Sequence, residues 1–512
     1  MRAPEASAGP AAAPAAAGVE TGGSDRRWRN QARSLAHYFL RSPECRPLRW
    51  LLAIGLAVRL VLIPLTSWGI DTAGFVFGNL QLIYTGDPYS SDLFFNPPFA
   101  PVVQSPLVLL AVLITGSQHL VGFFPEILPA AVATGMASPL VPIPIALLAI
   151  KLPLLLSDAA VAVVLWKLVR ARLGTGSATW VAAGWFLNPL VVWASAVHGE
   201  PDTFAALFML LALWMLLTER PFPAGVFLSL AVFTKLYPLL LLPLAIALLA
   251  TSTVGPAGRE VRWRVLGRFG VGLVLGAAPF LIWMPGLVRL LTQGGGSASY
   301  GGLSVLVVYN AAVPRGWGVL GFVQSWPHAV WLLYVLMGLA AVAAVGGAVL
   351  LARDRRAGRW PVGSGATPVL AALAAWVVVG ALVAAPVPQS ENVVGLLPLL
   401  LLALPALGRV GRWGYVVLSA AALGLYFALL TPAAYFYPLA TDLGPSAVDA
   451  INTLAIGYAS SQHGLTRGIA WLVVGLLGGS ALIALWLGAL NKLVLARRSK
   501  RPSNASPEPR GT

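Results

Sequence analysis

The sequence predicts an all-α polytopic membrane protein, and three observations lead to that prediction. Of the 512 residues, 58% are hydrophobic and only 10% are charged. The mean hydropathy of +0.80 is higher than a soluble domain with a polar exterior can sustain. The chain also contains many apolar runs close to the length of about 20 residues that crosses a bilayer. An ordinary soluble globular domain is therefore excluded.

The positive charges indicate which loops are cytoplasmic. The formal net charge of +16 is spread over short patches that lie between the apolar runs. Patches of this kind follow from the excess of Lys and Arg in cytoplasmic loops of membrane proteins, and they argue against a nucleic-acid-binding surface. The patches are Arg26–Arg49, Lys167–Arg172, Arg259–Arg268, Arg353–Arg359, Arg409 with Arg412, and Lys492–Arg501.

The first span orients the chain. With the basic segment before Trp50 in the cytoplasm, Leu51–Trp68 leads outward and delivers Asp71 to the outer face. The cytoplasmic patch that begins at Lys167 then requires an odd number of crossings, and Ile143–Val169 supplies one.

Two weaker apolar stretches lie between these spans. Pro98–Thr115 and Phe123–Pro142 are interrupted by Pro, Gly and Gln. They form either a complete hairpin or pieces of one large outer loop. We favour the loop, and both arrangements preserve the parity of crossings.

A broken span follows the next hairpin. Trp180–Val197 leads outward and Thr203–Leu217 returns. Ala224–Ala250 has the length of one crossing, yet basic residues flank it on both sides. Pro238 cannot continue a helix without losing a hydrogen bond, so we predict two short helices around it. Lys235, beside this break, is a candidate functional group because an unpaired lysine in a membrane is costly.

The later spans alternate with basic loops and raise the expected total to about 11–14 transmembrane or re-entrant helices. No internal repeat is evident, which weakens the case for an inverted-repeat transporter. Lys151 and Asp158 lie seven residues apart on one helix face, where a structural ion-pair network is the expected role. The remaining predicted spans are Phe269–Leu291, His328–Leu351, Val369–Ala385, Val393–Leu407, Tyr415–Leu430 and Ala470–Leu490.

Three stretches within residues 50–250 carry a family resemblance. The first, "DTAGFVFGNLQLIYTGDPYSSDLFFNPPFAP", starts at Asp71 just after the first span and contains Gly86-x-Pro88-Tyr89 and Phe95-Asn96-Pro97-Pro98. The second is "WFLNPLVVWASAVHGEPDTFAALFMLLAL", and the third is "AVFTKLYPLLLLPLAI". In order and spacing they resemble the GT-C glycosyltransferases, which are integral membrane enzymes.

The resemblance implies a GT-C-type helical bundle with a large first extracytoplasmic loop. It also implies inverting transfer of a sugar, most readily mannose, from a polyprenyl-phosphate carrier to a lipid, glycan or protein acceptor outside the cytoplasm. Asp71 is the implied catalytic base; without the resemblance, an N-cap role for the following helix is the plainer interpretation. A plasma-membrane protein surrounded by lipid, with no nucleic-acid partner, is expected.

With this resemblance, the chain is expected to divide into four segments. Residues 1–48 are expected to be a disordered, basic cytoplasmic segment and 49–291 the catalytic transmembrane module. Residues 292–491 form a second transmembrane module, and 492–512 a basic cytoplasmic tail. The first apolar run starts too far from Met1 for a cleavable signal. Cys45 is the only cysteine, so an intramolecular disulfide is excluded.

No metal or other cofactor is expected from the first loop. The Asp-x-Asp pair that some relatives use for metal binding is absent, because Ala73 stands at the second position after Asp71. His198, Glu200 and Asp202, beside Pro201, have two alternative roles. They either contact sugar hydroxyls or a metal, or the two acids stabilise the N-terminus of the next helix.

Several residues are candidates for substrate binding. Lys235 is the first candidate for the carrier phosphate, against an alternative in which it snorkels or pairs with Asp158. Arg289, Arg315 and Arg467 are assigned to the outer side of the membrane, where arginine is unusual. They suggest that the protein binds an anionic ligand. Asp87 has the alternative role of shaping a turn. The full set is Lys235, Tyr237, Asp87, Tyr89, His198, Glu200, Asp202, Arg289, Arg315, Gln389, Glu391 and Asn392.

Two other functions compete with glycosyl transfer. A transporter or flippase for a lipid-linked or anionic solute would use Lys235 and the outer arginines to bind its cargo. A lipid-glycan polymerase or ligase would share the architecture but take a diphosphate-linked donor. The polar groups gather at the outer interface and not at the membrane midplane, which favours the transferase.

Overall fold

The structure is a computed structural model. It describes residues 41–495 except 91–93, 95, 135–136, 253–257, 294–329, 358–359, 361–364, 386–388, 430–431 and 460. Two compact units are distinguished, Met1–Trp50 and Leu51–Thr512. Everything that follows concerns the second unit, where the candidate site lies.

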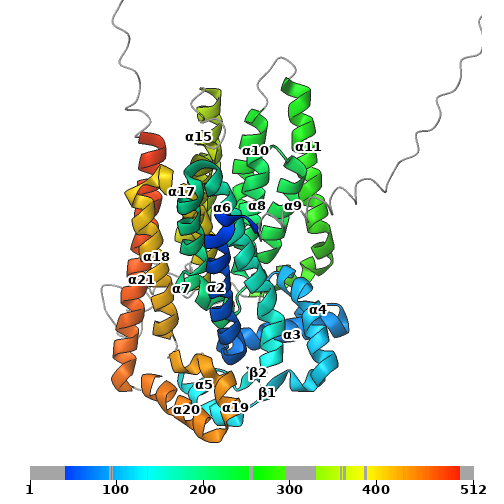
Figure 1. Cartoon of the computed structure of the whole chain (residues 1–512), viewed down its shortest axis with the longest axis vertical. Coiled ribbons are helices and arrows are strands. Elements are labelled where there is room, and N and C mark those ends of the chain that lie inside the picture. The colour runs from blue at the N-terminus through cyan, green and yellow to red at the C-terminus, as the bar shows by residue number, and fades with distance from the viewer. Residues whose placement is uncertain are drawn as a thin grey trace, which may run out of the picture. The chain divides into compact units, whose positions relative to one another are not determined.

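Helices make up almost all of the described chain (Figure 1). They are α2 (Arg46–Leu65), α3 (Gly69–Thr85), α4 (Phe99–Thr115), α5 (Leu128–Thr134), α6 (Pro144–Phe186), α7 (Pro189–Val192), α8 (Asp202–Leu217), α9 (Pro221–Thr234), α10 (Leu242–Ser252), α11 (Gly258–Ala277), α12 (Met284–Gln293), α15 (Val330–Arg356), α16 (Ala366–Ala384), α17 (Ser390–Leu407), α18 (Arg409–Leu429), α19 (Tyr437–Leu443), α20 (Pro445–Ala459) and α21 (Ser461–Leu490).

Seven helical segments in the described residues are long and apolar enough to cross a membrane, and five shorter apolar helices accompany them. This set fits the expected range of 11–14 transmembrane or re-entrant helices. The prediction of an all-α polytopic membrane protein is therefore confirmed. The two strands, β1 (Val121–Phe123) and β2 (Leu140–Pro142), form one small antiparallel hairpin.

The segment between α4 and α6 is folded, and its described residues contain no helix long enough to cross a membrane. Between Phe123 and Pro142 the chain forms α5, of seven residues, and the two short strands. None of these can cross a bilayer. The arrangement that we favoured from the sequence, pieces within one large outer loop, is the one observed for this segment. In Figure 1, α3, α5, α19 and α20 lie at the same end of the helices.

Helix α6 is two helices joined at a kink. Gly174, with φ of 78° and ψ of 177°, interrupts the helical geometry at the point where the basic patch ends. The two predicted spans on either side of that patch therefore exist as separate arms. The structural ion-pair network expected for Lys151 and Asp158 is present only for Asp158, whose Oδ2 accepts from Arg59 Nε at 3.0 Å, whereas Lys151 donates to backbone carbonyls.

The break near Pro238 is present as predicted. Helix α9 ends at Thr234, Lys235 is extended, and a 3-10 turn, η6 (Tyr237–Leu241), precedes α10. Glycines let α9 approach α11 closely, since a Cβ on Gly225 or Gly272 would collide with the backbone of the other helix. Such contacts between small residues are the usual way for helices to pack in a bilayer. Together these features fix the position of Lys235.

The C-terminal helices complete the surroundings of the site. Helix α17 packs against α6, α8 and α16, and it is buried over most of its length. Helix α18 packs beside α17 and α21 (Figure 1). Residues more than 180 positions apart are thereby brought together, with the start of α17 next to the turn that precedes α8.

Candidate functional site

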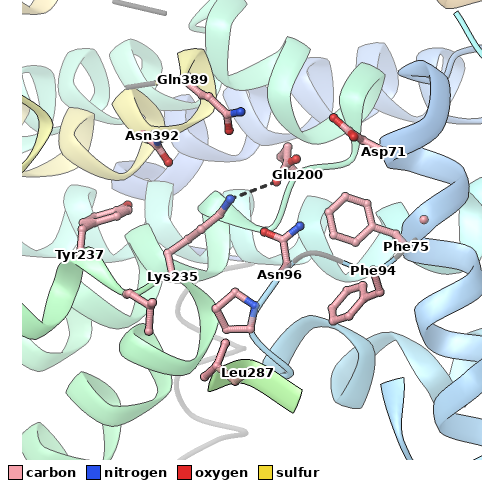
Figure 2. A pocket seen from close by; sticks show the side chains of 13 residues that line it. Asp71, Phe75, Phe94, Asn96, Glu200, Lys235, Tyr237, Leu287, Gln389 and Asn392 are labelled. Atoms are coloured by element: carbon pink, nitrogen blue, oxygen red, sulfur yellow. Dashed lines mark hydrogen bonds and ion pairs between the residues drawn. The ribbon is translucent and has the colours of Figure 1, made fainter. Parts of the chain in front are cut away.

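A polar cavity of about 500 Å³ opens between the segment that includes α3 and Asn96, the turn before α8, the break after α9 and the start of α17. Its charged wall carries Asp71, Glu200 and Lys235, and its amide groups come from Asn96, Gln389 and Asn392 (Figure 2). Apolar side chains, Phe75 and Phe94 among them, close the rest. The cavity is large enough for a sugar and part of a phosphate carrier.

Asp71 lies in the first turn of α3 at the edge of this cavity. Its side chain is 42% exposed, whereas the other acidic groups nearby are buried. The alternative role as helix N-cap is wrong, because Trp68 occupies the N-cap position and Asp71 lies inside the helix. The carboxylate Oδ2 is 3.4 Å from His198 Nε2.

The turn before α8 holds a buried histidine between two carboxylates. A π-helical turn, η5 (Trp193–His198), ends at Gly199, whose φ of 89° is left-handed. His198 Nε2 lies 3.3 Å from Glu200 Oε1, and Nδ1 lies 3.1 Å from the Tyr426 hydroxyl. Burial alone would lower the pKa of His198, but the charges of Glu200 and Asp71 raise it overall.

Lys235 is paired with two acids from the same turn. Its Nζ lies 3.4 Å from Glu200 Oε2 and 3.2 Å from Asp202 Oδ2. Burial favours the neutral amine, but these carboxylates outweigh it and raise the pKa of Lys235. Asp158, the partner expected for the structural alternative, pairs with Arg59 instead, and Lys235 lines the cavity.

Lys151 joins the two chain segments that carry Asp71 and His198. Its buried Nζ donates to the backbone carbonyls of Thr66 at 2.5 Å, Ala196 at 3.0 Å and Val197 at 2.8 Å. These carbonyls lie at the C-terminal ends of α2 and η5, where helices leave acceptors unsatisfied. Its alkyl chain also packs under Gly199, where an added Cβ would lie 3.1 Å from Lys151 Cε.

The residues of the Gly-Asp-Pro-Tyr turn lie apart from the acidic wall. Tyr89 is buried, and its hydroxyl donates to the Asn96 carbonyl at 3.0 Å. Asp87 Oδ1 accepts from the Tyr89 N–H, as the structural alternative for Asp87 predicts. Arg289 Nη2 donates to the Tyr89 carbonyl at 2.8 Å. In the structure these groups hold the turn against α12, while Arg315 lies outside the described residues.

The start of α17 forms part of the cavity wall. Gln389 and Asn392 line the cavity together with Tyr237, whose hydroxyl lies against Gly395 of α17. Glu391 is 6% exposed, and its charge acts on both His198 and Lys235. The structure thus assembles Asp71, His198, Glu200, Asp202, Lys235 and Glu391 into one cluster, which we call the acidic cluster.

Sequence reasoning overlooked two contributions. Asn96 was part of a quoted motif, but no role followed from its position in the chain, and the structure places its amide in the cavity. Nothing in the sequence marked Tyr426 as a residue of the site, because it lies within an apolar span far along the chain. The carbonyl acceptors of Lys151 are backbone groups, which no sequence motif records.

Three side chains of the acidic cluster could hold a metal ion. One ligand atom each from Asp71, His198 and Glu200 lies within 4.8 Å of the others. The same carboxylates can accept a proton or hydrogen-bond a sugar hydroxyl. The fold and the site therefore define a polytopic membrane protein with an acidic, partly solvated pocket at the ends of its helices.

Comparisons with known proteins found one family model and several solved structures similar to the chain. Residues 78–305 match the family model described as GPI transamidase subunit PIG-U, and this range includes the turn before α8 and Lys235. No curated protein matches the chain.

Two solved structures of ArnT from Cupriavidus metallidurans are similar to the chain. The structure bound to undecaprenyl phosphate is 16% identical, with a TM-score of 0.43, and the match covers 88% of this chain and 78% of ArnT. For the apo state the identity is 17%, the TM-score 0.40, and the coverage 87% and 76%.

Proposed function

We propose that the protein is a GT-C-type glycosyltransferase that transfers a sugar, most readily mannose, from a polyprenyl-phosphate carrier to an extracytoplasmic lipid, glycan or protein acceptor. One observation carries the proposal. Asp71, the residue that the family resemblance marks as the base, is the partly exposed carboxylate at the edge of a polar cavity. Behind Asp71, Lys235 pairs with the buried carboxylates of Glu200 and Asp202, and His198 lies beside Glu200.

The transfer requires one proton acceptor and one leaving group. Asp71 takes the proton of the acceptor hydroxyl while that oxygen bonds to the anomeric carbon of the donor sugar. The bond from the anomeric carbon to the phosphate oxygen breaks, and the electron pair leaves with the polyprenyl phosphate. Attack from the face opposite the phosphate inverts the anomeric centre. A positioned general base contributes about 100- to 10,000-fold to such a step.

Lys235 is the group that we assign to the carrier phosphate. Its side chain is 14% exposed and lines the cavity next to Glu200 (Figure 2). An ammonium group has three N–H donors, so two carboxylates leave one for a phosphate oxygen. Tyr237 and the amides of Asn96, Gln389 and Asn392 are placed to contact the sugar or the acceptor.

The proposal places the cavity on the outer side of the plasma membrane. Basic loops assign the opposite ends of the helices to the cytoplasm, and a polyprenyl carrier lies in the membrane beside the site. The proposal extends to other hexoses, which donors that carry different sugars distinguish in the assay. The acceptor class is left to the assay.

Transfer of radiolabelled mannose from polyprenyl-phosphomannose by membranes that contain the protein tests this function. Asp71→Asn keeps the size of the side chain but removes the base, so incorporation should fall about 100- to 10,000-fold at matched expression. Asp449→Asn, which changes an exposed acid on α20, is the matched control and should retain activity. Equal incorporation by Asp71→Asn and the wild type would remove Asp71 from the mechanism.

Absence of incorporation by the wild type with mannosyl, glucosyl and galactosyl donors would overturn the transferase assignment. The transporter then becomes the better account. It predicts instead that the protein, reconstituted in vesicles, moves a fluorescent polyprenyl-phosphate sugar between leaflets.

A further inference from the structure

The acidic cluster has more carboxyl groups than cationic partners. Four carboxyl groups, from Asp71, Glu200, Asp202 and Glu391, share the neighbourhood of Lys235 and His198. Lys235 contacts two of them, and no other lysine or arginine of the described chain pairs with the cluster. Buried carboxylates are costly unless a counter-charge is present. Either a proton on one of the buried acids or one more cation can therefore offset the excess of carboxyl groups.

His198 supplies an independent sign of a ligand. It is 2% exposed, and its Nε2 makes no hydrogen bond although two carboxylate oxygens lie 3.3 Å and 3.4 Å away. Nε2 faces two carboxylates, which is the arrangement of a metal ligand set once a metal ion has displaced the proton from this nitrogen. One atom each of Asp71, His198 and Glu200 lies within 4.8 Å of the other two.

The surroundings of His198 hold its ring in the required orientation. The Tyr426 hydroxyl lies 3.1 Å from Nδ1, so that Nδ1 can donate its proton to the phenol and leave Nε2 unprotonated. The Trp68 ring lies against the imidazole with 5.0 Å between centroids. Histidines that bind metals are typically fixed through the other ring nitrogen in this manner.

We propose that Asp71, His198 and Glu200 bind one divalent cation of the first transition row, such as Mn²⁺ or Zn²⁺. One imidazole with two carboxylates suits these ions better than Ca²⁺ or Mg²⁺, which take oxygen ligands. The ligands come from α3 and from a His-x-Glu turn, so the missing Asp-x-Asp pair in the first loop does not exclude them.

The ion would also explain how an acidic cavity can bind the anionic donor that the proposed function requires. A sugar phosphate is an anion, and the charged wall of the cavity is acidic, with Lys235 already engaged by Glu200 and Asp202. A bound dication would offset that wall and attract the phosphate. Asp71 would use Oδ2 for the ion and keep Oδ1 for the proton. This role rests on the proposed function, but the ion site itself does not.

Electron paramagnetic resonance of Mn²⁺ added to the purified full-length protein in lipid nanodiscs tests the site without any sugar donor. The wild type should bind one Mn²⁺ per chain, and added Zn²⁺ should release it, because Zn²⁺ binds such ligands more tightly. Asp71→Asn and His198→Gln should abolish saturable binding. Asp449→Asn, an exposed acid outside the cluster, should bind like the wild type.

Tyr426→Phe keeps the shape of the buried ring and removes only the hydroxyl beside Nδ1. It should weaken Mn²⁺ binding about 10- to 100-fold, the usual effect of losing a group that orients a metal ligand. Because Tyr426→Phe leaves all three ligands in place, it tests the site independently of the ligand substitutions. Size-exclusion chromatography detects any variant that misfolds. Unchanged Mn²⁺ affinity in folded Tyr426→Phe or His198→Gln protein would overturn the proposal, as would a wild type without saturable binding.

The outcome separates this site from the transferase assignment. Mn²⁺ binding without sugar transfer would leave the ion site standing and overturn the proposed function. Sugar transfer that persists at its full rate after chelation, in protein shown to be free of metal, would leave the proposed function standing and overturn the role of the ion in the transfer.

Discussion

At the residue scale, Lys151 shows how a buried cation can serve a site that it does not touch. Its Nζ donates to three backbone carbonyls, which matches its three N–H donors, and no acid is among these acceptors. Thr66 Oγ1 and Thr72 Oγ1 reinforce the same junction through the carbonyls of Ala196 and His198. The separation of Asp71 and His198 therefore depends on backbone contacts made behind the pocket.

Lys151→Met should lower kcat for sugar transfer about 10- to 100-fold while the KM for the donor changes little, because a displaced catalytic group loses rate and not uniform binding. Steady-state kinetics in nanodiscs give both values. The matched control is the double variant Arg59→Met with Asp158→Asn, which removes a buried ion pair on neighbouring helices. A purely structural role for Lys151 predicts that both variants lose thermal stability and that neither changes kcat.

The residue scale is also where the sequence was least informative. Asp71, His198, Glu200 and Lys235 could be singled out because charged residues are rare in this chain. Their mutual contacts could not, since Asp71 reaches His198 and Lys235 reaches Glu200 only after segments distant in the sequence have packed. The pairing of Asp158 with Arg59 rather than with Lys151 likewise depends on the packing of α2 on α6.

At the element scale, the contact between α9 and α11 positions Lys235 at the end of α9. Gly225 and Gly272 face the backbone of the opposite helix with no space for a side chain. The sequence predicted both helices from their apolar runs and the break from Pro238. It did not predict the contact, because an isolated glycine in an apolar run has the same appearance whether it packs against a helix or against lipid.

Gly272→Leu should destabilise the protein, because the Phe222 backbone blocks the position that the new side chain needs. Overpacking of this kind costs about 1–3 kcal/mol. Gly267→Leu is the matched control, since it lies on the same helix with nothing within 4 Å of an added Cβ. Thermal midpoints from fluorescence-detected size-exclusion chromatography compare the two, and equal midpoints would contradict the proposed helix contact.

At the scale of the whole molecule, the positions of basic residues predicted the topology, while hydropathy alone predicted the number of helices only as a range. Basic patches separate the two arms of α6 and flank the pair of helices around Lys235. The folded outer loop could not be predicted in detail, because α5 and the β1–β2 hairpin are short and depend on contacts with α3 and α20. Hydrophobicity identifies spans but not the loops that cover them.

Labelling of single cysteines in intact cells tests this topology. In a Cys45→Ser background, Ser90→Cys on the turn after α3 should react with a membrane-impermeant maleimide, because the cavity side is expected outside the cytoplasm. Thr218→Cys, an equally exposed position at the end of α8, should react only after the membrane is permeabilised. The opposite labelling pattern would place the pocket in the cytoplasm and contradict the proposed donor orientation.

The carbonyl acceptors of Lys151 have a consequence for how the chain is made. Thr66 precedes Lys151 by 85 residues, but Ala196 and Val197 follow it by 45 and 46. A lysine at the centre of a lone helix costs about 2.5–3.5 kcal/mol on insertion into the membrane. The first arm of α6 is therefore expected to wait beside the translocation machinery until the ribosome has produced the following hairpin. The order of synthesis thus becomes part of how this pocket is assembled.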